Sequence, residues 1–313
     1  RLFKQQYNLS LIPIRDLMCQ FCSVLTDIER SGMAIDLNVL TQVDKEYERE
    51  QAQLNSYLNQ KVRSLMGDLE VNLSSPEQLS QIIYSCKLVD KKSWKSLMNI
   101  GVDHRGKPLP RPTMDLNSFR EAVSSCFKRS KVVRSAKCPS CNGSGGYFKV
   151  KKDGTNFKKQ TKCEVCAGKG TIYIDLEDRG GLNLPPRLSL ASAGGFKTDK
   201  NTLSMLLNEV TEPEAKKFIE SIVRLSAIET YRSAFIEGIR KGIKSDGLLH
   251  ANFNQCITAT GRLSSSSPNL QNMPKGRLFP VRKAFVSRFK GGELVEIDYS
   301  QLEFRVAGIL ATD

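Results

Sequence analysis

The sequence predicts a mixed, mainly α fold of the α+β class, in which helical segments lead into the start of an antiparallel sheet. Three observations predict it: long stretches with apolar residues at helical spacing, short alternating stretches near the carboxyl end, and a duplicated cysteine pattern between them. The 313 residues are 40% hydrophobic and 26% charged, which excludes a disordered protein. No apolar run reaches the ~20 residues of a membrane-spanning helix, so no membrane partner is expected.

Two long helices are predicted in the amino-terminal part of the chain. Apolar residues recur at helical spacing over residues 14–31 and again over about 37–66, and a short extended link joins them at 33–36. Gly32 and Gly67 follow the two helices, where glycine takes the left-handed conformation of a helix end without steric cost. Such long amphipathic helices are typical of packed structural arms.

The third helix is predicted from a capping pattern, Ser75-Pro76-Glu77-Gln78. Ser75 is expected to cap the helix, Pro76 suits the first turn, and Gln78 is expected to bond back to the cap.

After Asp90 the helical periodicity breaks, apart from a helix predicted near residues 116–127. Thr211-Glu212-Pro213-Glu214 repeats the capping pattern and opens a long amphipathic helix that extends to Ile239. A turn is then predicted at 244–247 and a strand at 248–257. A second short strand is predicted at 293–298, with a helix from about Ser300.

The positive charge is concentrated in one segment. Residues 87–170 contain 20 Lys or Arg against six Asp or Glu, which accounts for the whole net charge of +14. A localised basic stretch is the electrostatic pattern of a surface that binds a polyanion. A solvated basic loop is the alternative.

Four cysteines in this basic segment form two copies of one pattern, Cys-x-x-Cys-x-Gly-x-Gly. The pattern begins at Cys138 and Cys141 and repeats at Cys163 and Cys166. Two pairs at this spacing supply the four sulfurs of a structural zinc site, and the residues between them fit a β-hairpin whose first strand begins near Tyr147. Two redox-active dithiols are the alternative. The isolated pair Cys19 and Cys22 lies on a predicted helix, and both cysteines are predicted to be buried core residues.

This repeat resembles the zinc modules of DnaJ-type co-chaperones. The resemblance implies one structural Zn²⁺ and a reducing compartment, and it does not imply chaperone activity. Neither His104 nor His250 is followed by the Pro-Asp of a J-domain signature.

Two stretches near the carboxyl end carry the functional signal. Residues 258–274 form a loop dense in Arg, Asn, Gln and hydroxyl side chains, which suit the acceptors of a DNA minor groove; a polar linker is the alternative. Residues 296–305 place Asp298 at the end of a predicted strand, where it can bind a hard cation, and Glu303 lies nearby. A helix-capping Asp with an exposed Glu is the alternative.

Together these stretches closely resemble two motifs of family A DNA polymerases. The loop is similar to Thr-Gly-Arg-Leu-Ser-Ser-x-x-Pro-Asn-Leu-Gln-Asn-Ile-Pro, and residues 298–305 are similar to the first palm motif, Asp-Tyr-Ser-Gln-Ile-Glu-Leu-Arg. Residues 28–36 and 72–79 resemble stretches of the family's thumb. The chain is therefore identified as a bacteriophage-type fragment covering the thumb and the start of the palm, and the resemblance leaves out roughly 90–186.

The resemblance implies template-directed DNA synthesis, in which two Mg²⁺ ions promote deoxynucleotidyl transfer to a primer 3′-hydroxyl. The expected partners are primer–template DNA and deoxynucleoside triphosphates, with a processivity partner at the thumb insertion as in related bacteriophage polymerases. The expected location is the cytoplasm, that of the host if the source is viral. The alternative function is a non-catalytic zinc-containing nucleic-acid-binding protein.

The resemblance also assigns roles to individual residues. Asp298 is expected to bind Mg²⁺ with the carbonyl of Tyr299, and Glu303 to act as the steric gate against ribonucleotides. Gln301 and Arg305 are expected on the helix that lines this site. The expected DNA contacts are Arg262, Asn269, Gln271, Asn272, Arg232 and Lys283. The fingers and the second catalytic carboxylate of the family are not in this sequence, so the fragment is predicted to be inactive alone.

The predicted organisation has five parts. Residues 1–13 are interpreted as the end of a preceding exonuclease domain, and 14–90 as the first part of the thumb. A basic insertion at 91–186 carries the zinc module at 138–170. The second part of the thumb follows at 187–245, and the palm begins at 246–313.

Overall fold

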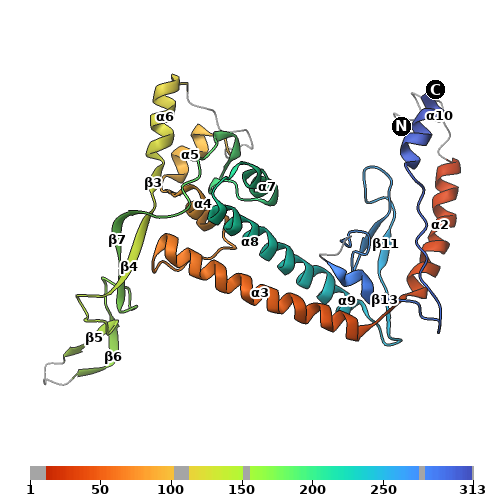
Figure 1. The fold of residues 1–313 in the computed structure, drawn as a ribbon, viewed down its shortest axis with the longest axis horizontal. Coiled ribbons are helices and arrows are strands. Elements are labelled where there is room, and N and C mark those ends of the chain that lie inside the picture. Colours follow the sequence, from red (N-terminus) through yellow and green to blue (C-terminus); the bar gives the residue numbers. More distant parts are fainter. Residues whose placement is uncertain (1–11, 102–112, 151–155, 275–278, 312–313) are drawn as a thin grey trace. The chain divides into compact units, whose positions relative to one another are not determined.

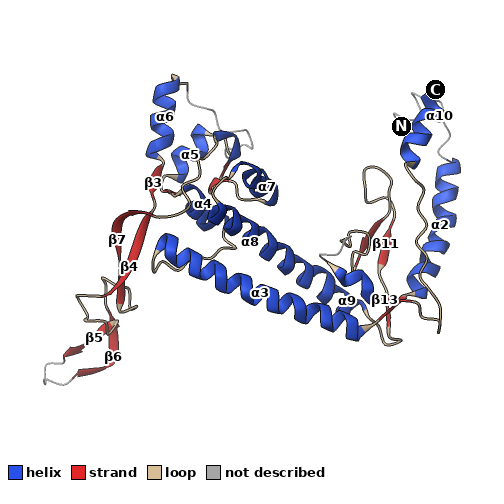
Figure 2. Cartoon of the chain, viewed as in Figure 1, coloured by secondary structure: helices blue, strands red, loops and turns tan. Residues whose placement is uncertain are grey.

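The computed structural model describes residues 12–101, 113–150, 156–274 and 279–311, and it has the predicted mixed α+β fold. Figures 1 and 2 show helices joined to small antiparallel sheets. The chain divides into two compact units, which we call unit 1 (residues 1–51 and 227–313) and unit 2 (residues 52–226). Most of the predicted first segment, 1–13, lies outside the described residues. None of the described helices is both long and apolar enough to cross a membrane.

The long helices have the predicted bounds. Helix α2 is Ile12–Ser31 and α3 is Leu37–Met66, and Gly32 and Gly67 follow them with φ of +62° and +75°. The later long helix comprises α8 (Pro213–Thr230), a π-helical segment η2 (Tyr231–Ile236) and α9 (Glu237–Gly242). Helices α3 and α8 are predictable because each buries an apolar face, whereas Leu17 and Ile28 of α2 are 65% and 47% exposed.

Unit 1 contains a three-stranded antiparallel sheet with the predicted 33–36 link at its centre. Strand β1 (Met33–Ile35) pairs with β10 (Leu248–Leu249) on one side and with β13 (Phe285–Val286) on the other. A second small sheet pairs β11 (Asn252–Asn254) with β12 (Ser264–Ser266), and a short 3₁₀ helix, η3 (Pro280–Ala284), precedes β13. The segment that links the first two helices therefore forms the central strand of this sheet.

Two strand predictions in this unit need correction. The stretch 248–257 is divided into β10 and β11, which pair with different partners. Residues 293–298 form no strand, and Val295 and Ile297 are 78% and 89% exposed. A strand needs a neighbour for its backbone hydrogen bonds, and no described strand pairs with 293–298. The following helix, α10 (Leu302–Ala311), begins two residues later than predicted.

His250 connects the end of α2 with the turn before β10. Its Nδ1 lies 2.6 Å from the carbonyl oxygen of Glu29, and its Nε2 lies 3.0 Å from Oδ2 of Asp246. Carbonyl and carboxylate oxygens only accept hydrogen bonds, so both ring nitrogens donate when His250 is an imidazolium. The Glu29 carbonyl first, and then Asp246, raise the pKa of His250 above its ordinary value of 6.5.

We expect this raised pKa to be measurable in solution. His250 should titrate above pH 6.5, so its contribution to stability should be complete below that pH and lost as the pH rises through the folded-state pKa. The chain has two histidines, so NMR titration of the imidazole protons can follow each one. Asp246→Asn should lower the His250 pKa toward 6.5 and leave His104 unchanged. Identical titration of His250 in the parent and in Asp246→Asn would contradict the assignment.

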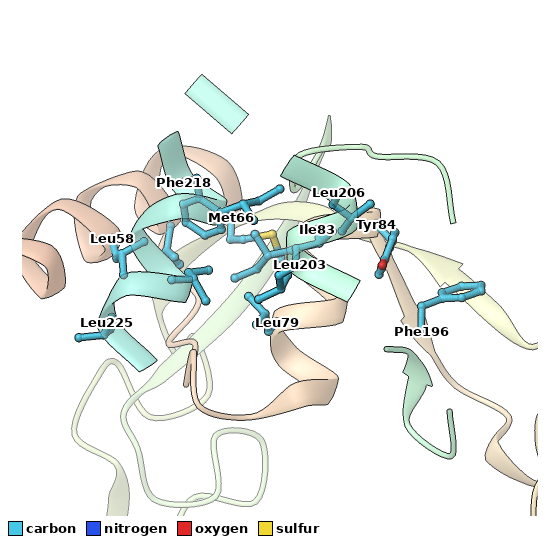
Figure 3. Close-up of a cluster of buried hydrophobic side chains, with 14 of the residues drawn as sticks. Leu58, Met66, Leu79, Ile83, Tyr84, Phe196, Leu203, Leu206, Phe218 and Leu225 are labelled. Carbon is cyan, nitrogen blue, oxygen red and sulfur yellow. The ribbon is translucent and has the colours of Figure 1, made fainter. Parts of the chain in front are cut away.

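Unit 2 contains the main hydrophobic core, part of which is shown in Figure 3. Leu58 and Met66 from α3 and Phe218 from α8 are fully buried there, and they pack with Leu79 and Ile83. The unit is built from the later part of α3, the first part of α8, and a set of shorter elements. These are α4 (Pro76–Tyr84), α5 (Lys91–Leu97), α6 (Leu116–Ser125), α7 (Lys200–Glu209), η1 (Leu188–Leu190), the pair β2 (Cys86–Leu88) and β3 (Phe127–Arg129), and the pair β8 (Ala191–Ser192) and β9 (Gly195–Phe196).

The predicted start of α4 is correct, but its capping interaction is not. The Ser75 side chain makes no capping hydrogen bond. Gln78 does not bond back to Ser75, because its Oε1 accepts a 2.7 Å hydrogen bond from the backbone N–H of Asn72. The side chain thus closes the preceding loop.

Helix α5 was not predicted, because seven residues rich in lysine show little periodicity. Its Trp94 is fully buried, donates a 2.7 Å hydrogen bond from Nε1 to the carbonyl of Ser192, and packs edge-on against Phe127 and Phe196. The beginning of the basic segment therefore belongs to the core of unit 2. The bounds 91–186 for an insertion stay a prediction.

Residues 131–179, which include the last part of the basic segment, form two successive β-ribbons that we call the arm. Strand β4 (Lys131–Lys137) pairs with β7 (Thr171–Arg179), and β5 (Gly146–Val150) pairs with β6 (Asn156–Lys162), both antiparallel (Figure 2). The predicted hairpin between the cysteine pairs is confirmed, and the cysteines lie between the two ribbons in the chain.

Candidate functional site

The four predicted cysteines form one cluster at the junction of the two ribbons. All four Sγ atoms lie within 4.8 Å of one another, and Cys138, Cys163 and Cys166 are buried. Cys138 and Cys163 are 3.8 Å apart at sulfur, and Cys141 and Cys166 are 3.7 Å apart. Among the described residues, no other group of three or more metal-ligating side chains comes together.

This geometry fits a tetrahedral zinc ion. With Zn–S bonds of about 2.3 Å, tetrahedral ligands lie about 3.8 Å apart. A backbone hydrogen bond from Cys166 lowers the pKa of Cys163 to about 6, whereas burial raises the pKa of Cys138 to about 11. The lowered pKa of Cys163 favours the thiolate form that zinc binds, and a bound cation would displace the proton that burial favours on Cys138.

The two copies of the cysteine pattern, which we call the knuckles (residues 138–145 and 163–170), share their glycines because these are structurally required. The N–H of Cys138 donates to the carbonyl of Gly170, and the N–H of Cys163 donates to the carbonyl of Gly145, both at 2.9 Å. Gly145 and Gly170 have φ of +76° and +75°. A Cβ atom on Gly145 would lie 2.5 Å from the carbonyl oxygen of Gly168 in the other knuckle. A Cβ atom on Gly170 would lie 2.4 Å from the carbonyl oxygen of Gly143. The knuckles therefore pack as a symmetrical pair that requires glycine at these positions.

The other cysteine pair does not form a site. Cys19 and Cys22 are exposed on α2, which corrects the prediction that they lie in a core. Helical spacing identifies the apolar residues of α2, but it does not show which side of the helix packs against other elements.

The loop 258–274 in unit 1 presents its polar residues to solvent around a few buried anchors. Ser265 is 5% exposed, and its Oγ accepts from the N–H of Leu270 and donates to the carbonyl of Pro268, at 3.2 Å each. Met273 is buried, and its carbonyl accepts a hydrogen bond from Arg282. Met273 and Ser265 are thus two buried anchors of the loop.

The predicted DNA contacts of this loop are exposed. Arg262, Gln271 and Asn272 have exposed side chains. Asn269 is also exposed, and its Oδ1 accepts from the backbone N–H groups of Gln271 and Asn272 at 3.2 and 3.1 Å. The loop can therefore offer Arg and amide side chains to a ligand without breaking its core.

The segment of Asp298 is exposed as well. Asp298 and Tyr299 precede α10 in an irregular stretch, and Gln301 has φ of +50°. Arg305 donates from Nε to the carbonyl of Ser300 at 3.0 Å, which ties the start of α10 to this stretch. Asp298 is a hard oxygen donor suited to Mg²⁺, and among the described residues it belongs to no cluster of three or more metal-ligating side chains.

The structure brings the two motifs together at one contact. Arg262 Nη2 of the loop lies 2.7 Å from Glu303 Oε1 on α10, and both side chains are more than 70% exposed. An ion pair this exposed contributes little net free energy, so a ligand can displace it.

The two remaining predicted DNA contacts differ in their surroundings. Lys283 is exposed. Arg232 lies in the π-helical segment and is held by Asp44 and Gln51 at 2.8 and 2.7 Å. A phosphate would therefore compete with these partners for Arg232.

Asp44 was not singled out in the sequence, although it also accepts a 2.9 Å hydrogen bond from Arg240. Burial acts to raise its pKa, but the hydrogen bonds from Arg232 and Arg240 outweigh burial and hold the pKa below its ordinary value. The sequence offered one indication of these ion pairs, which is an acidic residue, Asp44, within a helix that is predicted to be packed.

Comparisons with known proteins agree with these motifs. Residues 180–313 match the family described as DNA polymerase family A. DNA polymerase I of Mycobacterium tuberculosis is 37% identical over 123 residues, which cover 38% of this chain and 13% of that protein. The thermostable DNA polymerase I of Thermus aquaticus is 40% identical over 120 residues, which cover 37% of this chain and 14% of that protein. The chain thus spans a small part of these relatives.

A solved structure, the POL domain of Pol1 from M. smegmatis in complex with DNA primer-template and dNTP, aligns with 92% of this chain and 32% of its own. The TM-score is 0.47 and the identity is 21%. The evidence for the family is the sequence match over 180–313, which contains both motifs. This part of the chain therefore belongs to DNA polymerase family A.

Proposed function

We propose that the protein carrying this chain is a template-directed DNA polymerase that adds deoxynucleotides to a primer 3′-hydroxyl. The observation that carries the proposal is the presence of the loop 258–274 and of the residues 298–305 in the family-matched segment, with both motifs exposed in the structure. The proposed partners are primer–template DNA and deoxynucleoside triphosphates. We place its action in the cytoplasm, and a bacteriophage source stays a prediction.

In this proposal, Asp298 would offer its carboxylate and Tyr299 its carbonyl to Mg²⁺. When bound, the metal ions would activate the primer hydroxyl and stabilise the leaving pyrophosphate. Among the described residues, Asp298 belongs to no cluster of three or more metal-ligating side chains, so we propose that the fragment is inactive by itself. The residues of the loop would position the duplex. Arg262 would contact the minor groove with Asn269, Gln271 and Asn272.

Glu303 is proposed to exclude ribonucleotides by crowding the sugar 2′-hydroxyl. With a nucleotide bound, the Glu303 carboxylate would leave its ion pair with Arg262. Because both side chains of that pair are highly exposed, breaking it would cost little free energy. Gln301 and Arg305 would support the start of α10. DNA binding would thus separate the two motifs and direct each to its own part of the substrate.

The proposal predicts a change in sugar selectivity. In the full-length polymerase, Glu303→Ala should retain DNA synthesis and raise the relative kcat/KM for ribonucleotides by about tenfold or more, because the crowding carboxylate is removed. Single-nucleotide primer extension with each sugar measures the ratio. Glu293→Ala is the matched control, since Glu293 is an exposed carboxylate on the same stretch. Equal ratios in both variants would contradict the gate.

Primer extension by the unaltered polymerase tests the function itself. Template-dependent extension is the expected result. Binding of primer–template without any extension would instead support the non-catalytic zinc-containing nucleic-acid-binding protein.

The four cysteines are proposed to hold one structural Zn²⁺. The sulfur–sulfur distances and the paired knuckles support this choice. We assign this ion a structural role, because four cysteine sulfurs complete the tetrahedral shell of a zinc ion and leave no open position for a substrate.

A further inference from the structure

The β5–β6 ribbon of the arm exposes two aromatic rings that the polymerase motifs do not explain. Tyr147 is 48% exposed and Phe148 is 49% exposed. The hydrophobic cluster of the arm contains the four cysteines and Ile172 and includes neither ring. The two rings are adjacent in the chain and neither belongs to the buried cluster of the arm, so both are available to contact a ligand.

Two lysines lie close to the rings in the chain or in the strand register. Successive residues of a strand point to opposite faces, so Tyr147 and Phe148 lie on opposite faces; Lys149 follows them in the chain, where the register with β6 shifts between Phe148 and Val150. Phe148 is opposite Gln160 and Gly146 is opposite Lys162, so Lys162 is a diagonal neighbour of Phe148 on its face. Lys149 and Lys162 are both exposed. The ribbon thus carries one ring on each face, with the ammonium groups of Lys149 and Lys162 close to them in the chain and in the register.

The charge of this region selects the class of partner. Residues 137–170 contain eight Lys, no Arg and two acidic residues. Such an excess repels basic protein surfaces and attracts a polyanion. A nucleic acid supplies both the negative phosphates and the flat aromatic bases that the ribbon could contact.

The rings distinguish a single strand from a duplex. In a duplex the base faces are covered by neighbouring base pairs, and lysines alone would be sufficient to contact the phosphates. In a single strand the base faces are accessible, and stacking on aromatic side chains adds affinity without sequence preference. The near-equal exposure of Tyr147 and Phe148 therefore favours a single strand.

We propose that the β5–β6 ribbon binds single-stranded nucleic acid, with Tyr147 and Phe148 stacking on bases and Lys149 and Lys162 contacting phosphates. The cysteine knuckles hold the base of the ribbon, since the N–H of Cys163, the residue after β6, bonds to Gly145, the residue before β5. This binding goes beyond the proposed function. It needs no nucleotide addition, so either proposal can fail without the other.

The test measures binding of the 313-residue chain to a fluorescein-labelled oligothymidylate by fluorescence anisotropy at several salt concentrations. The double variant Tyr147→Leu/Phe148→Leu should bind at least about fivefold more weakly, with an unchanged salt dependence, because stacking is lost and the phosphate contacts remain. Lys149→Gln/Lys162→Gln should bind more weakly and make the log–log salt slope less negative by about 1.4, since each single-strand phosphate contact contributes about 0.7.

Two controls separate stacking from folding. Phe289→Leu removes a 68% exposed ring outside the arm and should bind like the parent. Tyr147→Phe keeps a ring on the ribbon and should retain binding.

The same variants are then measured with a duplex of equal length. Parent-like affinity of the Tyr147→Leu/Phe148→Leu variant for oligothymidylate would overturn the proposal. An equal loss of duplex and single-strand affinity would also overturn it, because stacking on bases would then not be the cause.

A second measurement does not depend on any variant. Oligonucleotides containing 5-bromodeoxyuridine, irradiated on the unaltered chain, should crosslink to Tyr147 or Phe148, as located by mass spectrometry. Crosslinks confined to unit 1 would overturn the proposal.

Discussion

Replacing Asp298 by Ala in the full-length polymerase should abolish nucleotide addition while primer–template binding survives. Asp298 is the acidic residue that we propose as a ligand of Mg²⁺, and its side chain is exposed in the irregular stretch before α10. Loss of a metal ligand removes several kcal/mol of transition-state stabilisation, so we expect a rate loss of about 10³-fold or more. Binding should persist because the exposed DNA contacts of the loop 258–274 are unchanged.

Single-turnover primer extension measures the rate, and anisotropy with labelled primer–template measures binding. Glu293→Ala, which removes an exposed carboxylate from the same stretch, should extend primers like the parent. An Asp298→Ala enzyme that retains extension within tenfold of the parent would show that this carboxylate does not hold the metal.

Replacing Cys138 by Ser should remove zinc from the chain and loosen the arm. Cys138 is fully buried in the cluster, and the arm has almost no other hydrophobic core. Structural zinc contributes on the order of 10 kcal/mol in small zinc domains, which is more than two isolated two-stranded ribbons could supply. The parent chain should contain about one zinc per molecule when it is purified without added metal.

Elemental analysis gives the zinc content, and limited proteolysis at the lysines of the arm reports its folding. Cys19→Ser is the matched control, because Cys19 is exposed on α2 and lies outside the cluster. It should keep both the zinc and the protease resistance. Zinc content that stays at the parent level in Cys138→Ser would rule out the four-sulfur site, and the two-dithiol alternative would then be tested by redox titration.

The arm combines these two features. Its zinc site is proposed to fix the ribbons, and its rings and lysines are proposed to bind nucleic acid. A Cys138→Ser variant should therefore also lose the part of oligothymidylate affinity that depends on Tyr147 and Phe148.

Several features of this protein could be read from the sequence because they depend on residues close together in the chain. The bounds of α2 and α3 follow from apolar spacing and from Gly32 and Gly67, since helical hydrogen bonds join residues four apart. The cysteine cluster follows from duplicated knuckles, whose tight turns are local. The residues of the polymerase motifs were also identified in this way, and the family match over 180–313 includes them.

Only the tertiary structure decided which distant residues meet. It placed the 33–36 link at the centre of a sheet with residues more than 200 positions away, left 293–298 without a described partner, and brought Trp94 into the core. It also paired Arg232 with Asp44, which the role assigned from the motif did not anticipate. Strand pairing and buried ion pairs depend on partners from remote parts of the chain, and the local pattern of one segment does not specify which partner arrives.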